Sequence, residues 1–85
     1  MSVRLLYFAW VREKLGRSEE TVVLPHNLKT VADVMAWLAA RSPEYNEVFS
    51  RVGLIRVALD QAHAQPSAAI AGVRDIAFFP PVTGG

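Results

Sequence analysis

The sequence holds few side chains suited to catalysis. Its two histidines, His26 and His63, lie in turn-like or weakly structured segments, and neither has a second ligand at the spacing of a metal site. Asp60 and Gln61 follow an apolar run, which is typical of a turn rather than of a general acid or base. The chain has no cysteine, which excludes disulfide bonds, thiolate catalysis and cysteine-ligated zinc. We therefore expect the histidines to be surface residues and the protein to have no catalytic side chain of its own.

Chemistry is instead concentrated in the last residues, which read FPPVTGG from Phe79 and include no charged side chain. Pro80 and Pro81 restrict φ and favour an extended, polyproline-like backbone. Val82 and Thr83 are β-branched and favour extended geometry as well. The segment is therefore predicted to be a stiff arm, whereas a flexible linker would be richer in Gly, Ser and charge.

The arm ends on Gly84 and Gly85, which lack a Cβ and can pass through a channel too narrow for other residues. Six extended residues reach roughly 20 Å, enough to deliver the α-carboxylate of Gly85 into the active site of a partner. Because a carboxylate is a poor electrophile, it must first be activated, for example as a mixed anhydride with AMP. The activated acyl group would then accept sulfur or react with an amine.

Length and composition limit what the rest of the chain can be. With 85 residues and 9.4 kDa, it is expected to form one domain with one modest core and little room for a deep pocket. The net charge of +1, without a basic block, argues against a nucleic-acid partner. No apolar run reaches the length needed to span a membrane, and the N-terminus lacks the pattern of a signal peptide. We expect a cytoplasmic protein without a nucleic-acid or membrane partner.

Alternating and β-branched apolar residues predict the strands of the domain. The first predicted strand has apolar residues on both faces, which favours a central position in the sheet. A short helix is predicted between the first two strands, ending at Gly16. The predicted strands are Val3–Ala9, Glu20–Leu24, Leu54–Leu59 and Asp75–Phe79, with a brief edge strand at His63–Gln65.

The main helix is predicted to begin at Thr30, where Asp33 three residues on completes a capping pattern. One apolar face follows at helical spacing, and Ser42-Pro43 is predicted to end the helix. The pattern of residues 44–51 is ambiguous and fits a helical turn. The order of elements predicts an α+β domain, a mixed sheet of about four to five strands with one main helix packed across it.

The stretch Ala77–Gly85, AFFPPVTGG, resembles the C-terminal signature of the small, sulfur-carrying subunits of molybdopterin synthase. The segments Tyr7–Glu13 and Thr30–Asp33 are similar to the first strand and the main helix start of that family. The resemblance implies a ubiquitin-like β-grasp fold. Residues 1–79 would form the domain and residues 80–85 an extended Gly-Gly tail.

The resemblance also implies a function, that of a carrier subunit without catalytic side chains. An ATP-dependent activating enzyme would adenylate Gly85, and a sulfur-donor system would convert it to a thiocarboxylate. The tail would then enter the active site of the large synthase subunit and give sulfur to the dithiolene of molybdopterin, made from cyclic pyranopterin monophosphate. The chain would bind no cofactor, carry sulfur covalently at Gly85 and act in a hetero-oligomer. The residues that the resemblance assigns to partner binding are Phe8, Arg12, Phe79, Pro80, Pro81, Val82, Thr83 and Gly84.

Three other functions fit the same tail. A sulfur carrier for thiazole synthesis and a ubiquitin-like protein modifier would both need Gly84-Gly85. A non-covalent interaction module whose tail only docks would not need an activated carboxylate. The aromatic-Pro-Pro approach to the glycines favours the carrier for molybdopterin.

Overall fold

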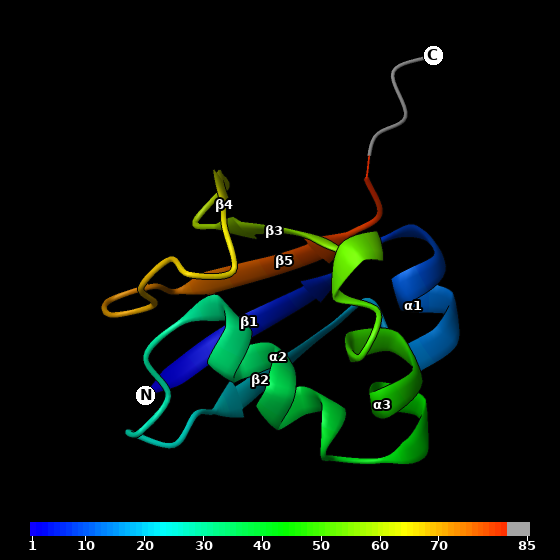
Figure 1. Cartoon of the computed structure of the whole chain (residues 1–85), viewed down its shortest axis with the longest axis horizontal. Helices are drawn as coiled ribbons and strands as arrows, with labels where there is room; N and C mark the ends of the chain where they lie inside the picture. The colour runs from blue at the N-terminus through cyan, green and yellow to red at the C-terminus, as the bar shows by residue number, and fades with distance from the viewer. Residues whose placement is uncertain (82–85) are drawn as a thin grey trace.

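The computed structural model describes residues 1–81, in which five strands form one mixed sheet in the order β2-β1-β5-β3-β4 (Figure 1). β1 pairs antiparallel with β2 and parallel with β5, and β5 pairs antiparallel with β3. β1 and β5 are thus interior strands, as the apolar residues on both faces of the first predicted strand indicate. The strands are β1 Ser2–Tyr7, β2 Glu19–Val23, β3 Arg56–Leu59, β4 Ala62–Ala64 and β5 Asp75–Phe79.

Three α-helices and one 3₁₀ turn accompany the sheet: α1 Ala9–Leu15, α2 Val31–Ala39, α3 Pro43–Phe49 and η1 Val52–Leu54. In Figure 1, α2 and α3 lie in front of the sheet and α1 lies beside the end of β5. The predicted capping of the main helix is confirmed, since the Thr30 hydroxyl accepts from the Asp33 N–H and the Asp33 carboxylate accepts from the Thr30 N–H. The predicted glycine end of α1 is also confirmed, because Gly16 has a left-handed φ of 72°.

The segment around Ser42-Pro43 differs from its prediction. The main helix ends earlier, at Ala39, and Ser42 and Pro43 begin a further helix instead. The Ser42 hydroxyl accepts from the Tyr45 N–H at 3.3 Å, and proline in the first turn loses no helical hydrogen bond. A Ser-Pro pair therefore signals the end of one helix and the start of the next equally well. The segment whose structure was ambiguous in the sequence contributes most of α3, so that, within the described residues, two shorter helices accompany the main one.

Smaller shifts affect the strands. The third strand begins at Arg56 rather than Leu54, because residues 52–54 form the 3₁₀ turn. The brief edge strand exists but starts one residue earlier, at Ala62. The predicted turn at Asp60-Gln61 is confirmed, with positive φ at both residues. The Asp60 carboxylate also accepts the backbone N–H groups of Arg74 and Asp75, which fixes the start of β5.

The core lies between the sheet and the helices. Residues of β1 and β5 alternate between buried positions facing the helices and more exposed positions on the opposite face. At the end of β5, the buried Phe78 ring stacks on Tyr7 with centroids 6.0 Å apart and meets Phe49 edge-on at 4.9 Å. This cluster fixes the last residues of β5 and so the position from which the C-terminal segment departs. The predicted α+β fold class is confirmed.

Candidate functional site

The described chain ends beside the first loop of the protein, at one end of the sheet. β1 and β5 run parallel, with Tyr7 opposite Phe78. The next residue of β1, Phe8, donates its N–H to the Phe78 carbonyl at 3.1 Å. In Figure 1 the end of β5 accordingly lies next to the start of α1. This pairing makes Phe8 and Phe79 neighbours, although they are far apart in the sequence. We call the surface formed by Phe8, Arg12, Arg56, His63, Phe79, Pro80 and Pro81 the tail root.

Phe8 is held by its backbone and leaves its ring at the surface. It precedes α1 as the N-cap residue, and its carbonyl accepts the N–H groups of Val11 and Arg12. The following residue, Ala9, has φ of 52°, a left-handed conformation that is unfavourable for a residue with a Cβ. The Phe8 side chain is 48% exposed. A large exposed apolar ring on a fixed backbone is typical of a contact surface for another protein.

Phe79 is half-buried and ends the ladder of β5. Its ring meets His63 of β4 edge-on, with centroids 5.4 Å apart, and its backbone lies opposite Arg56 of β3. Pro80 and Pro81, also half-buried, have no N–H to donate to a further strand pair. The sequence therefore ends the sheet at the point where the predicted tail begins.

Arginine side chains flank this aromatic surface. Arg12 lies one helical turn beyond Phe8 on α1, and Arg56 lies across the sheet beside Phe79; both are exposed. Neither forms an ion pair with another residue in the range 1–81, whereas Arg4 pairs with Asp75 at 3.0 Å. The tail root therefore combines apolar rings with positive charge, which suits a protein surface that carries carboxylates.

A second cluster of polar groups surrounds Glu20 of β2, whose side chain is only 10% exposed. Its carboxylate accepts the hydroxyls of Tyr7 and Tyr45, at 2.7 and 2.5 Å, and pairs with Arg17 and Arg41 at 3.2 Å. Burial opposes ionisation of Glu20, but the hydrogen bonds from the two tyrosines and from Arg41 outweigh it and lower its pKa. Burial, together with the bond to Glu20, raises the pKa of both tyrosines. This cluster joins β2 to α3 and offers no group to a ligand.

Known proteins are similar to this chain in both fold and sequence. Residues 5–85 match the profile of the ThiS family. The chain belongs to that family. It is 31% identical over 83 residues to the molybdopterin synthase sulfur carrier subunit of Haemophilus influenzae, covering 98% of this chain and 99% of that subunit. The predicted resemblance to small subunits of molybdopterin synthase is thereby confirmed.

Solved structures confirm the ubiquitin-like fold of this ThiS-family chain. SAMP1 from Haloferax volcanii superposes with a TM-score of 0.74 at 29% identity, and the match covers 100% of both chains. Molybdopterin converting factor, subunit 1, from Pyrococcus furiosus superposes with a TM-score of 0.71 at 20% identity, covering 96% of this chain and 99% of that one. At that identity the second likeness shows the fold alone.

The structure places most of the predicted partner-binding residues together. Phe8 and Phe79 are neighbours, Arg12 lies beside Phe8, and Pro80 and Pro81 follow directly. The predicted tail residues Val82, Thr83, Gly84 and Gly85 lie outside the described residues.

Sequence reasoning missed Arg56 and His63 at the tail root. His63 is exposed, as predicted, but its ring contacts Phe79. Their place on the face of the sheet that Phe79 shares could have been found only from the register of β3 with β4 and β5.

The described residues hold no other feature that suggests catalysis. Within residues 1–81, no three metal-binding side chains lie close enough together to hold an ion. None of the helices in that range is long and apolar enough to cross a membrane. The tail root, with its exposed ring and its arginines outside ion pairs, is the candidate site that remains within these residues.

Proposed function

We propose that this ThiS-family chain is the sulfur carrier of a molybdopterin synthase and that its reactive group is the α-carboxylate of Gly85. Full-length identity of 31% to a subunit of that name supports the assignment. The observation that carries the proposal is the tail root, an exposed aromatic surface flanked by arginines at which the described residues end with Pro80 and Pro81, directly before Val-Thr-Gly-Gly in the sequence. Such a surface lets a partner hold the domain while the tail reaches into an active site.

The proposed chemistry balances without a catalytic side chain from this chain. The carboxylate of Gly85 attacks the α-phosphorus of ATP in the activating enzyme, forming the acyl adenylate and releasing pyrophosphate. A sulfur nucleophile then attacks the acyl carbon, so that a C–S bond forms, a C–O bond breaks and AMP leaves. The thiocarboxylate sulfur then attacks a carbon of the pterin precursor in the large subunit and displaces an oxygen substituent there, which leaves a thioester between the two molecules. Water hydrolyses the acyl C–S bond of this thioester, so that the sulfur stays on the precursor and the Gly85 carboxylate is restored.

The domain contributes recognition to this cycle. Phe8 and Phe79 supply apolar contact area on a backbone fixed by the β1–β5 pairing. Arg12 adds charge that steers a partner bearing carboxylates and fixes its orientation. The activating enzyme, the sulfur donor and the large subunit are the proposed partners.

Intact-mass spectrometry tests the proposal. The purified protein is incubated with the activating enzyme, ATP and hydrosulfide as the sulfur nucleophile. We expect the mass to rise by the difference between one sulfur and one oxygen. An unchanged mass, with ATP consumed or not, would overturn the carrier function.

Two controls identify the reactive group and the acceptor. Deleting Gly85 should abolish the mass increase and leave the folded domain intact, since the core lies within the described residues. Adding the large subunit and cyclic pyranopterin monophosphate should return the mass to its starting value as molybdopterin forms. If the sulfur is retained in that step and is instead transferred to a thiazole precursor, the alternative sulfur carrier is favoured. If the protein instead forms amide bonds to lysines of other proteins, the ubiquitin-like modifier is favoured.

A further inference from the structure

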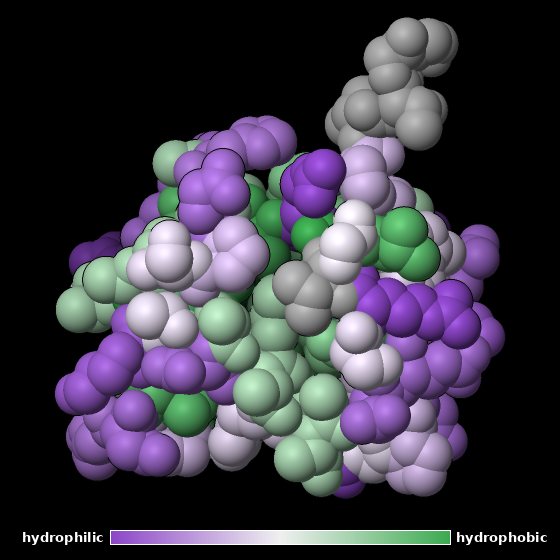
Figure 2. All heavy atoms as spheres, in the orientation of Figure 1, coloured by the Kyte–Doolittle hydropathy of each residue, from purple (hydrophilic) through white to green (hydrophobic). Residues whose placement is uncertain are grey.

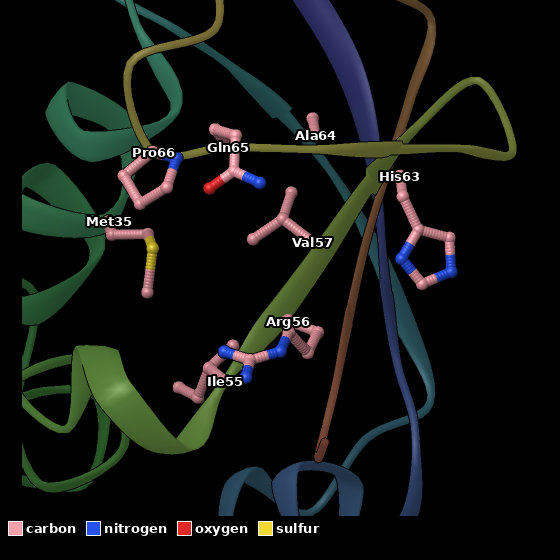
Figure 3. Close-up of a pocket in the computed structure, with 8 residues that line it drawn as sticks. All are labelled: Met35, Ile55, Arg56, Val57, His63, Ala64, Gln65 and Pro66. Carbon is pink, nitrogen blue, oxygen red and sulfur yellow. The ribbon is translucent and has the colours of Figure 1, made fainter. Parts of the chain in front are cut away.

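A cavity of about 370 Å³ lies at the opposite edge of the sheet from β2, between α2, the start of β3 and the segment that follows β4. Figure 2 shows the surface hollowed beside the first residues of β3, with apolar atoms inside and hydrophilic atoms at the rim. In Figure 3, Met35 and the Gln65 amide point toward this space, whereas the His63 ring points away from it. Two of its lining residues, Arg56 and His63, also belong to the tail root, but the proposed carrier function assigns no role to the cavity itself.

The backbone beside the cavity lacks a strand partner. The bond from the Asp60 N–H to the Asp75 carbonyl fixes which residues of β3 face β5. In an antiparallel strand, the backbone N–H and carbonyl groups of successive residues point alternately to one neighbouring strand and to the other. Those of Val57 and Leu59 therefore point to β4, and those of Ile55 would point to the same side. The residue that the register places opposite Ile55 is Pro66, which has no N–H and whose carbonyl already accepts from Ala32 at 2.9 Å.

Ile55 therefore offers its carbonyl at this edge, whereas its N–H lies at the end of the 3₁₀ turn Val52–Leu54, where i→i+3 bonds are formed. Within residues 1–81, no backbone hydrogen bond outside the helices and strand ladders involves this carbonyl. The Ile55 side chain is 4% exposed and continues the inward alternation of Val57, so its backbone extends the line of β3. An open position of this kind, beside a hollow, accepts one more extended segment.

The side chains around the cavity define the chemistry of that segment. Met35, Ile55 and Val57 supply an apolar wall, which fits an aliphatic side chain. Arg56 and Gln65 supply a guanidinium and an amide, and no carboxylate lines the cavity. Among residues 1–81, Arg56 forms no ion pair. A carboxylate next to an aliphatic residue would complement both features.

We propose that this cavity binds an extended segment of a partner protein, which adds to the edge of β3 at Ile55 and places an acidic side chain on Arg56. The segment would donate a backbone N–H to the Ile55 carbonyl and seat an aliphatic side chain against Met35. This site goes beyond the proposed carrier function, since a partner bound there contacts the edge of the sheet and does not need residues 82–85. A partner could thus hold the carrier without occupying the reactive tail.

A designed peptide tests the site directly. The probe is acetyl-Thr-Val-Asp-Val-Thr-amide, titrated into the full-length ¹⁵N-labelled protein. We expect amide shifts on binding that are centred on Ile55, Arg56 and Gln65. Replacing the aspartate of the peptide by asparagine should weaken binding about tenfold, because the charge-assisted pair is lost.

Matched variants locate the contact. Arg56→Gln should weaken binding of the aspartate peptide about tenfold and remove its advantage over the asparagine peptide. Arg12→Gln, at the other exposed arginine of the tail root, should leave the affinity unchanged. Equal losses in both variants would place the peptide across the surface between Arg12 and Arg56 rather than in the cavity and would overturn the proposal. Shifts that avoid Ile55, or the absence of binding at millimolar peptide, would overturn it as well.

The remaining occupants are distinguished by truncation. If a chain ending at Pro81 binds the peptide several-fold more tightly than the full chain, residues 82–85 compete for the cavity, and the occupant is the tail of this chain. If the Ile55 shifts depend on protein concentration without peptide, the occupant is a second copy. Either result overturns the proposal of a partner segment. The titration needs no ATP, activating enzyme or sulfur, so its outcome is independent of the carrier function.

Discussion

Two regions of the molecule differ in whether their arginine side chains form ion pairs. Around Glu20, the side chains of Arg17 and Arg41 converge on one nearly buried carboxylate, which also accepts two tyrosine hydroxyls. Arg41 additionally lies over the Tyr45 ring, with its guanidinium carbon 4.7 Å from the centroid. At the tail root, Arg12 and Arg56 flank exposed or half-buried rings and form no ion pair within residues 1–81.

The difference separates what holds the fold together from what the fold presents. The Glu20 cluster satisfies its polar groups internally, so changes there should lower the stability of the domain. The tail root leaves apolar rings and charge at the surface, so changes there should lower affinity for partners instead. Each prediction below tests one side of this division.

The sharpest test compares neighbouring phenylalanines of β5. Phe78 is fully buried among aromatic rings, so Phe78→Ala should lower the free energy of unfolding by about 3–5 kcal/mol. Phe79→Ala should cost only about 1 kcal/mol, yet weaken binding to the large synthase subunit roughly 10- to 100-fold. Urea unfolding and calorimetric titration measure the two effects. Should Phe78→Ala prevent folding, Phe78→Leu takes its place with a smaller loss.

Equal stability losses for the two phenylalanines would contradict the division, because both would then act as core residues. Unchanged affinity in Phe79→Ala would remove Phe79 from the partner surface. Circular dichroism of each variant confirms that affinity is measured on folded protein.

The next largest effect is expected at Glu20. Glu20→Ala removes the acceptor of two tyrosine hydroxyls and the partner of Arg41, and should lower the free energy of unfolding by about 2–3 kcal/mol. The control is Glu19→Ala, a neighbour in β2 whose exposed carboxylate lies 3.8 Å from Arg4 and should contribute less than about 0.5 kcal/mol. Urea unfolding of both variants at pH 7 checks the contrast. Similar losses would mean that the cluster contributes no more than a surface pair.

The pH dependence of stability should follow from the same carboxylate. The pKa of Glu20 is lower in the folded state than its ordinary value, so the folded protein binds its proton less readily than the unfolded chain. Its contribution is therefore complete above the ordinary glutamate pKa and is lost as pH falls through the folded value. Urea unfolding between pH 7 and pH 3 should show that the free energy of unfolding decreases as the pH is lowered.

Glu20→Gln isolates this contribution, because the amide keeps an acceptor and cannot titrate. Its stability should fall less steeply below about pH 4.5 than that of the unaltered protein. Some slope should remain, since hydrogen bonds lower the pKa of Asp33 at the start of α2 and of Glu47 beside Lys14. Parallel curves for the two proteins would exclude Glu20 as a source of the pH dependence.

The smallest effect is expected at the backbone next to the tail root, at the residue after Phe8. Ala9 has φ of 52°, which glycine adopts without strain, so Ala9→Gly should raise the free energy of unfolding by about 0.5–1 kcal/mol. Ala36→Gly, at an exposed position within α2, should instead lower it by about 1 kcal/mol. Opposite signs in thermal unfolding would confirm the strain, and a loss in both variants would contradict it.

Local features of this protein were predictable from the sequence. The capping box of Thr30 and Asp33, the end of α1 at Gly16 and the turn at Asp60-Gln61 all depend on hydrogen bonds or φ angles within a few residues. The Ser42-Pro43 pair is the exception, because the same two residues fit a helix end and a helix start. Tertiary packing decided that a helix starts there, because Tyr45, Val48 and Phe49 of α3 are buried in the core.

The sequence by itself thus determined the order of the strands and the main helix, the family and the chemistry proposed for the Gly-Gly tail. Only the tertiary structure brought Phe8 beside Phe79, through the parallel pairing of β1 with β5. It also joined Glu20 to Tyr45 and Arg41, and left Ile55 without a strand partner where Pro66 interrupts the edge. These arrangements join residues far apart in the chain and depend on strand register and side-chain packing, which no local pattern encodes.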